Sequence, residues 1–306
     1  MTIVSSTENK RSRVYQAGTI KRGRRTRAQT DQLDRQIIEA LAKDNPQSVR
    51  HVFYLMTDPR MPEPVEKSDR GYTHVQHRCV ELRRSGKLSF NWFSDTSRRG
   101  YFVNTFDGAA DFVRRMASNY RANLWEDSDH YCEVWCESRS IAGVILSDCQ
   151  ELGVSLYPAG GFASMTFIYE AAQQINAIEG RKPVVIYYIG DYDPAGVMID
   201  RSIEAGMRKH LDSDINLTFV RLGITKQQIK DHDLSTKPRK AGDKRSLEIK
   251  FTVEAEAMPA HLLRSILRAS VESLLPTRAL MVYKLVEKGE RADLIAMANR
   301  LDRRRS

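Results

Sequence analysis

The sequence predicts an α/β protein in which a helical domain precedes a domain built on a parallel β-sheet. Two observations support this fold class. Residues 31–125 open with segments that have the apolar spacing of amphipathic helices, whereas residues 126–275 alternate short apolar strands with helices. A chain of 306 residues, of which 41% are hydrophobic, is long enough for two ordinary cores. Residues 276–306 are expected to form a basic C-terminal helix or tail.

The N-terminal 30 residues are strongly basic and have almost no periodic apolar pattern, which predicts a disordered basic arm. Against the one acid Glu8 they carry Lys10, Arg11, Arg13, Lys21, Arg22, Arg24, Arg25 and Arg27. The whole chain has a formal net charge of +9, which favours a polyanionic partner such as double-stranded DNA. A solvated tail or a targeting stretch is the alternative interpretation of the arm.

Three amphipathic helices are predicted after this arm, over residues 31–43, 48–56 and 68–85. Asn45-Pro46 ends the first helix, Ser48 begins the second, and Ser68 is a suitable N-cap for the third. One face of the third helix is apolar, with Tyr72, Val75, Cys79 and Leu82. Its other faces are basic, with Arg70, His74, His77, Arg78 and Arg84.

Residues 87–103, "KLSFNWFSDTSRRGYFV", predict short strands around a basic turn. Three helices followed by a β-hairpin is the order of a winged helix, and a basic third helix suits a DNA groove. The candidate DNA-binding residues are Arg83, Arg84, Arg98 and Arg99. A small helical domain with a solvated basic face is the alternative.

From residue 126 the pattern changes to alternating strands and helices, which predicts a doubly wound parallel sheet. The strands are expected at residues 131–137, 154–158, 183–190 and 215–223, separated by helices at 138–152, 160–177 and 195–209. The strand "PVVIYYIG" is continuously apolar, as expected for a strand buried on both faces. A mobile basic loop at 237–245 and an amphipathic helix at 258–275 follow.

Three carboxylates are expected at one edge of this sheet. Glu137 ends the first strand of the unit, and Asp191 and Asp193 follow the third. Ligands gather at the carboxyl ends of parallel strands, where these side chains would repel one another unless a cation neutralised them. Oxygen ligands of this kind suit Mg²⁺. The alternative is that the aspartates cap the next helix.

The cysteines and the hydropathy pattern predict an intracellular protein. Cys79, Cys132, Cys136 and Cys149 form no CxxC pair and have no zinc-site spacing, so they are expected to be buried thiols in a reducing compartment. No apolar run reaches about 18 residues, and no signal peptide is recognisable, so no membrane span is expected. A cytoplasmic, nucleoid-associated protein is the resulting expectation.

The acidic motif resembles that of a TOPRIM domain, which occurs in topoisomerases, bacterial primases and some nucleases. The resemblance rests on Glu137 at a strand end and on "GDYDPAG" about fifty residues later. The metal-binding glutamate of that family corresponds to Glu137, and its DxD pair to Asp191 and Asp193.

The second helix adds a candidate nucleophile. At about 100° per residue its apolar residues form one stripe, and Tyr54 lies roughly 150° from the stripe's centre, on the same side as Arg50. The segment "NPQSVRHVFYLM" resembles the winged-helix segment of the DNA-cleaving subunit of topoisomerase VI and of its eukaryotic relative, the meiotic double-strand-break transesterase. In that resemblance Tyr54 corresponds to the nucleophile and Arg50 to the arginine beside it.

The resemblance implies Mg²⁺-dependent DNA cleavage by transesterification, with a 5′-phosphotyrosyl product and a homodimer in which each Tyr54 acts with the other subunit's TOPRIM domain. The chain is short for a protein of that family, and it is similar to stand-alone relatives from phages and other mobile elements. It has no Gly-rich nucleotide loop, so an ATPase partner would be a separate chain. The alternatives are a TOPRIM nuclease that uses activated water, and a non-catalytic DNA-binding protein.

Overall fold

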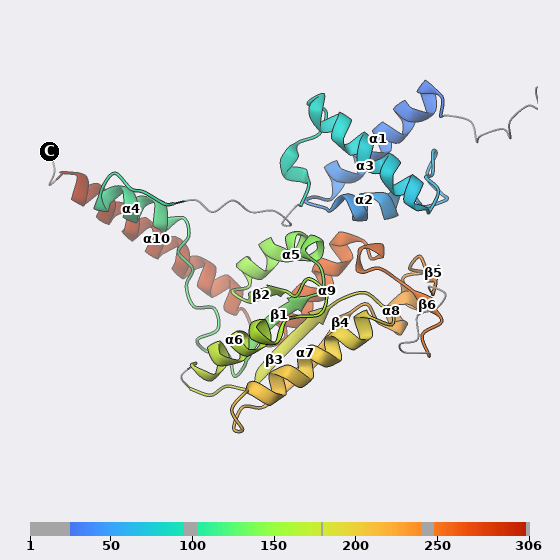
Figure 1. The fold of residues 1–306 in the computed structure, drawn as a ribbon. Helices are drawn as coiled ribbons and strands as arrows, with labels where there is room; N and C mark the ends of the chain where they lie inside the picture. The colour runs from blue at the N-terminus through green and yellow to red at the C-terminus, as the bar shows by residue number, and fades with distance from the viewer. Residues whose placement is uncertain (1–24, 95–102, 179, 240–247, 304–306) are drawn as a thin grey trace, which may run out of the picture.

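The computed structural model describes residues 25–94, 103–178, 180–239 and 248–303, and Figure 1 shows their fold. The described chain is a mixed α/β structure with a four-stranded parallel sheet, as the alternation of strands and helices predicts. A group of N-terminal helices lies beside the sheet domain, and the last helix extends away from both (Figure 1).

The N-terminal helices are α1 (Arg27–Lys43), α2 (Val49–Met56) and α3 (Asp69–Arg84), which confirms the three predicted helices. Each begins at a hydroxyl residue whose side chain accepts a hydrogen bond from a backbone N–H of the first turn: Thr26, Ser48 and Ser68. Their shared core includes Leu33, Ile37, Leu41, Val52, Met56, Val75, Cys79 and Leu82. Helix α1 begins earlier than expected, so residues 27–30 of the predicted arm are helical, and residues 1–24 lie outside the described chain.

The predicted hairpin is wrong in its described part. Phe90–Trp92 form a 3₁₀ turn, η1, and Phe93 makes a parallel bridge to Gln47. The Ser89 hydroxyl accepts a hydrogen bond from the Asn91 N–H, and Trp92 and Phe93 pack against the helical core. Docking of these aromatic rings onto the core therefore replaces the strand that their β-propensity predicts. Arg98 and Arg99 lie outside the described residues.

The sheet contains β1 (Tyr131–Cys136), β2 (Ser155–Pro158), β3 (Val184–Ile189) and β4 (Leu217–Gly223). The order is β2-β1-β3-β4 with every pair parallel, so the predicted strands are confirmed. All six residues of β3 are buried, as its continuous apolar run predicts.

Helices cover both faces of the sheet. Helices α5 (Arg139–Glu151) and α9 (Ala260–Glu272) pack on one face, with Ile145 and Leu267 against Val134 of β1 and its neighbours. Helices α6 (Met165–Asn176) and α7 (Gly196–His210) cover the other face, where Trp135 and Ile186 meet Ile203. Helix α8 (Lys226–Asp231) follows β4.

The remaining elements join the sheet domain to the helical domain. Strands β5 (Lys237–Pro238) and β6 (Phe251–Thr252) form a short antiparallel ribbon, and a 3₁₀ turn, η2 (Ala255–Ala257), follows it. Ala257 packs against the core of the helical domain. The His261 N–H of α9 donates a hydrogen bond of 3.1 Å to Asp44, which also pairs with Arg264.

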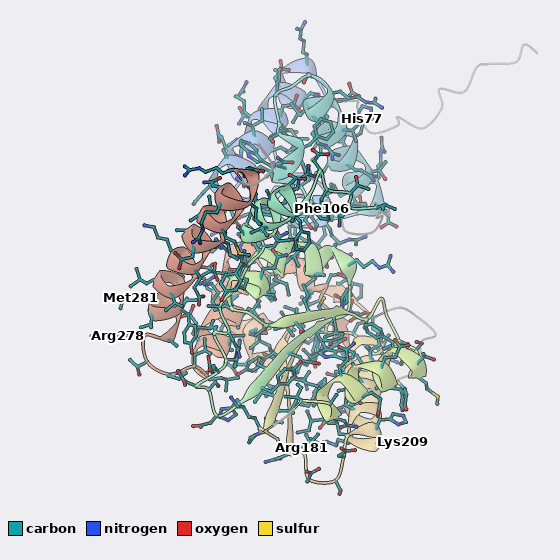
Figure 2. The ribbon with its side chains drawn as sticks, turned by 90° about the vertical axis from the view of Figure 1, so that its left-hand side faces the viewer. His77, Phe106, Arg181, Lys209, Arg278 and Met281 are labelled. Carbon is teal, nitrogen blue, oxygen red and sulfur yellow. The ribbon has the colours of Figure 1, made fainter. Side chains whose placement is uncertain are left out.

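Helix α4 (Ala109–Ala117) lies along α10 (Ala279–Arg303) and forms a two-helix arm with it, away from α1–α3 (Figure 1). The ion pair of Arg114 with Asp302, at 2.5 Å, and the hydrogen bond from the Tyr120 hydroxyl to Glu290, at 2.5 Å, hold the arm together. Figure 2 shows Met281 on the outward side of α10, where the side chain is exposed. Part of the predicted basic tail, residues 300–303, completes this helix.

The four cysteines are buried free thiols, as predicted. Within the described ranges, the helices are all too short or too polar to cross a membrane.

Substitution of two helical glycines by alanine is expected to change the unfolding free energy in opposite directions. A methyl group on Gly71 of α3 would lie 1.9 Å from the Glu66 carbonyl oxygen, whereas one on Gly289 of α10 would enter open space among the described residues. Gly71→Ala should therefore destabilise the protein by about 1–3 kcal/mol. Gly289→Ala should stabilise it by about 0.5–1 kcal/mol because alanine loses less backbone entropy in a helix. Urea unfolding followed by circular dichroism measures both free energies. An equal change in the unfolding free energy of the two variants would contradict the fold around α3.

Candidate functional site

The carboxyl ends of β1 and β3 bring Glu137 and Asp191 together. The strands pair in register up to Cys136 and Ile189, and the Asp191 N–H donates a hydrogen bond of 3.0 Å to Glu137 Oε2. Glycine at position 190 permits this approach, since a β-carbon there would lie 2.8 Å from the same Glu137 oxygen. The predicted meeting of these two carboxylates at one sheet edge is thus present.

Asp193 is engaged differently. Its Oδ1 accepts a hydrogen bond of 2.6 Å from the Gly196 N–H at the start of α7, so this side chain caps the helix. Asp191 Oδ1 accepts a hydrogen bond of 2.8 Å from the Ala255 N–H of η2. The helix-cap interpretation therefore holds for Asp193, whereas Asp191 binds a segment from much later in the chain.

A fourth carboxylate, Glu256, belongs to the same cluster. It is buried in η2 and accepts a hydrogen bond from the Ser140 hydroxyl at the start of α5. Burial, together with the charges of Glu137 and Glu256, raises the pKa of Asp191 to about 8. Burial also raises the pKa of Glu137, assisted by the charges of Asp193 and Glu256. Sequence reasoning missed Glu256 because it follows no strand and belongs to no motif.

Burial first, and like charges second, raise these two pKa values, and a bound cation would lower them again. The oxygen-only donor set of Glu137, Asp191 and Asp193 fits a hard ion such as Mg²⁺. Within the described ranges, however, no three Asp, Glu, His or Cys side chains are already arranged to hold a metal ion. Binding through all three carboxylates would therefore require these side chains to rearrange.

Tyr54 is buried, with 8% of its surface exposed, which corrects the expectation that it lies off the packing surface. The helical wheel treats α2 as packed on one side only. In the structure the helical core covers one side of α2, and η2 covers another, with Ala257 in contact. The Tyr54 hydroxyl is buried without a hydrogen-bond partner among the described residues.

The surroundings of Tyr54 disfavour its phenolate in this conformation. Burial raises its pKa, and the carboxylate of Glu254 raises it further, whereas the charge of Arg50 acts in the opposite direction. Arg50 Nη1 donates a hydrogen bond of 2.6 Å to Glu254 Oε2, and its guanidinium lies 4.8 Å from the centre of the Tyr72 ring. Arg50 is thus close enough to influence Tyr54 but is bound to a carboxylate.

A cleft of about 930 Å³ separates the helical domain from the sheet domain. It is lined by Gln47, His51, Tyr54, Lys67, Ser235 and Glu256, among others. The Gln47 Oε1 and His51 Nε2 atoms are buried without hydrogen-bond partners in the described part of the chain. Burial lowers the pKa of His51 to about 3, so this imidazole is neutral near pH 7. The cleft is thus lined by charged residues such as Lys67 and Glu256 and by residues whose uncharged polar atoms, the Tyr54 hydroxyl among them, are buried.

The predicted DNA-binding arginines differ in availability. The Arg83 guanidinium lies 4.5 Å from the centre of the Phe93 ring, and its Nε donates a hydrogen bond of 3.1 Å to the Cys79 carbonyl. Arg84 is 73% exposed and pairs with Glu81 at 3.3 Å across one helical turn. Arg84 is therefore the more available of the two for a polyanion, since a surface pair of this kind is weak.

Comparisons of this chain with models of protein families, with curated proteins and with solved structures found no match.

A second carboxylate on β1, Glu133, lies inside the core rather than at the sheet edge. It is fully buried, and it accepts hydrogen bonds of 2.8 Å from Trp135 Nε1 and 3.0 Å from the Tyr131 hydroxyl. Burial outweighs these bonds and raises the pKa of Glu133 to about 7. The folded protein therefore binds this proton more tightly than the unfolded chain does.

Glu133→Gln is expected to remove a pH dependence of stability. Because the folded-state pKa is raised from 4.5 to about 7, the stabilisation is complete below 4.5 and is lost as the pH rises to about 7. The difference in unfolding free energy between variant and wild type should change by about 1–3 kcal/mol between pH 4.5 and pH 7, in favour of the variant at high pH. Urea unfolding at a series of pH values measures it. Glu170→Gln, at an exposed position on α6, is the control, and parallel profiles for Glu133→Gln and wild type would contradict the assignment.

Proposed function

We propose that this chain cleaves double-stranded DNA by tyrosine transesterification, with Tyr54 as nucleophile and the carboxylate cluster as a Mg²⁺ site. One observation carries the proposal: two consecutive residues contact both candidate sites. Glu254 accepts a hydrogen bond of 2.6 Å from Arg50, which lies on the helix of Tyr54, and the Ala255 N–H donates one of 2.8 Å to Asp191. One short segment thus links the helix of the candidate nucleophile to a candidate metal ligand of the same chain, which supports a site within one chain rather than the expected pairing of each Tyr54 with the other subunit's carboxylates.

In this proposal the Tyr54 oxygen attacks a backbone phosphorus, and the bond from phosphorus to the 3′ oxygen breaks. The phenolic proton passes to water, the leaving 3′ oxygen takes up a proton from water, and the DNA keeps a 5′-phosphotyrosyl link to the protein. When bound to Glu137, Asp191 and Asp193, Mg²⁺ would stabilise the negative charge that develops on the leaving oxygen. Arg50 would hold the phosphate by charge-assisted hydrogen bonds.

The phenol must change its surroundings before it can react. A tyrosine has a reference pKa near 10, and the pKa of Tyr54 is raised above that by burial and by Glu254. Entry of DNA into the cleft between the domains would place a substrate phosphate next to the hydroxyl, in a region that also contains cationic side chains. This conformation is therefore interpreted as the state before DNA binds.

The proposal extends to architecture and assembly. The helical domain would act as a winged helix, with Arg83, Arg84, Arg98 and Arg99 toward DNA, and the sheet domain as a TOPRIM domain. Two copies of the chain would make one double-strand break, as the DNA-cleaving subunits of topoisomerase VI do, and any ATPase would be a separate chain.

A metal-dependent nuclease that uses activated water is the second candidate. The burial of the Tyr54 hydroxyl favours it, because the carboxylate edge could then act without the tyrosine. The two candidates differ in whether DNA remains covalently attached to the protein.

Tyr54→Phe is expected to abolish covalent protein–DNA adducts. The assay is incubation with supercoiled plasmid and Mg²⁺, quenched with SDS and resolved with and without protease. The variant loses one buried oxygen atom that has no hydrogen-bond partner among the described residues, so its unfolding free energy should equal or exceed that of wild type. Tyr72→Phe, at a half-buried tyrosine of the same domain, should retain the adducts. Wild-type adduct yield from Tyr54→Phe, or a nucleotide attached to another residue, would overturn the nucleophile.

Amide variants of the carboxylates remove the negative charge but keep the shape of the side chain, so their effects are expected to report the role of the charge. Glu137→Gln and Asp191→Asn should lower cleavage about 100-fold, because each removes a charged metal ligand. The same variants should raise the melting temperature in EDTA, since mutual repulsion is relieved, and should lose the stabilisation that Mg²⁺ gives the wild type.

Asp193→Asn keeps an oxygen that can accept the hydrogen bond from the Gly196 N–H. A loss of cleavage in this variant would therefore come from the missing charge and not from a lost helix cap. Glu170→Gln serves as the control for a change in net charge. Normal cleavage and an unchanged response to Mg²⁺ in all three amide variants would rule out the site.

A further inference from the structure

Three cations from separate elements surround the Tyr54 ring. Arg50 comes from α2, Lys67 from the loop before α3, and Lys237 from β5. The Lys67 and Lys237 Nζ atoms lie 5.5 and 5.7 Å from the centre of the Tyr54 ring, and the charge of Arg50 acts on Tyr54 as well. We call Arg50, Lys67 and Lys237 the cationic cradle.

The cradle concentrates like charge in a partly buried place. Burial, followed by the charge of Lys237, lowers the pKa of Lys67 to about 8. Such a cluster is stabilised by an anion between its members, and cationic groups grouped in this way on a concave surface are typical of phosphate sites.

In the described conformation that anion is Glu254. Its Oε2 accepts a hydrogen bond of 2.6 Å from Arg50 Nη1, and its Oε1 accepts one of 2.7 Å from Lys237 Nζ. Its charge also acts on Lys67. One carboxylate therefore uses both oxygens to bridge two cations of the cradle, in the way that the two non-bridging oxygens of a phosphodiester do.

We propose that the cationic cradle binds a DNA backbone phosphate next to Tyr54, and that Glu254 occupies the cradle as an internal competitor until DNA displaces it. The inference rests on the proposed function, because it names the groups that would hold the phosphate beside the nucleophile. It assigns Lys67, Lys237 and Glu254 roles that the motif around Tyr54 does not contain.

The exchange is chemically balanced. A carboxylate and a phosphodiester each carry one negative charge, so replacing one by the other leaves the cradle neutralised to the same extent. The side chains of Arg50, Lys237 and Glu254 are 39%, 38% and 24% exposed, so a polymer can reach them from solvent. The adjacent cleft of about 930 Å³, which Tyr54 and Lys67 line, offers space for the approaching strand.

Lys67 adds a link to the far side of this cleft. Its Nζ donates a hydrogen bond of 2.9 Å to the Thr236 carbonyl and another to the Ser235 hydroxyl. The cradle therefore spans the junction of the two domains, and the Arg50–Glu254 contact is itself an interdomain ion pair. A phosphate bound there would contact both domains at once.

The test measures DNA affinity without cleavage, in the full chain carrying Tyr54→Phe, with a short fluorescein-labelled duplex, EDTA and anisotropy detection. Glu254→Gln should bind the duplex about tenfold more tightly than its parent, because a charged competitor worth about 1.4 kcal/mol is removed. Glu248→Gln, at an exposed carboxylate nearby in the chain, makes the same change in net charge and should shift the affinity far less.

The lysines give an independent measurement. Lys67→Gln and Lys237→Gln should each weaken binding and lower the slope of log affinity against log salt by about 0.9, as expected for the loss of one phosphate contact. Lys288→Gln, at an exposed position on α10, is the matched control. Thermal melts establish that each variant is folded, and if Glu254→Gln is not, the two lysine variants decide.

The inference is overturned if Glu254→Gln binds DNA no more tightly than Glu248→Gln. It is also overturned if Lys67→Gln and Lys237→Gln have the same DNA affinity and salt slope as Lys288→Gln. Glu254 would then be only an interdomain contact. Because the assay contains no cleavage step, a protein that never forms adducts can still show these affinity changes. Failure of the nucleophile assignment and failure of the cradle are therefore distinguishable.

Discussion

The five-residue segment 253–257 is the constraint on which the arrangement of both domains depends. Its backbone binds the sheet edge, because Val253 forms an antiparallel bridge with Tyr192 and the next turn donates an N–H to Asp191. Its two acidic side chains make further contacts: Glu254 pairs with Arg50 of α2, and Glu256, within the carboxylate cluster, accepts a hydrogen bond from Ser140 at the start of α5. The carboxylate cluster, the interdomain ion pair and the covering of α2 all arise from this one stretch, so a shift in it would alter all three together.

Much of the fold is predictable because its signals are local. The apolar run of β3 and the serine caps of α2, α3 and α5 are properties of a few consecutive residues, and the structure follows them. The segment "FNW" at residues 90–92 is different. Its aromatic content favours a strand, but Trp92 packs on the helical core together with the next residue, Phe93, while Phe90 stays exposed, and tertiary packing decides the backbone conformation.

In the candidate site, too, local sequence signals predict some contacts, whereas tertiary packing decides others. Glu137 and Asp191 could be predicted to meet, because the ends of neighbouring parallel strands share an edge. The burial of Tyr54 could not be predicted in this way, because a helical wheel describes one packing surface and α2 is covered on more than one side. Glu254 and Glu256 carry no sequence signal. They lie in an irregular turn, and the bridge from Val253 to the sheet edge brings Glu256 to the other acids and Glu254 to Arg50.

The arm formed by α4 and α10 has a consequence for the order in which this protein can be made. Helix α4 ends at Ala117 and its partner begins at Ala279, so the whole sheet domain is translated between them. At ribosomal elongation rates the partner emerges roughly 8–32 s after α4, about 160 residues later. During that interval the sheet domain can fold, while α4 has no partner helix to pack against. The arm is therefore completed late in biosynthesis, after the sheet domain has been translated.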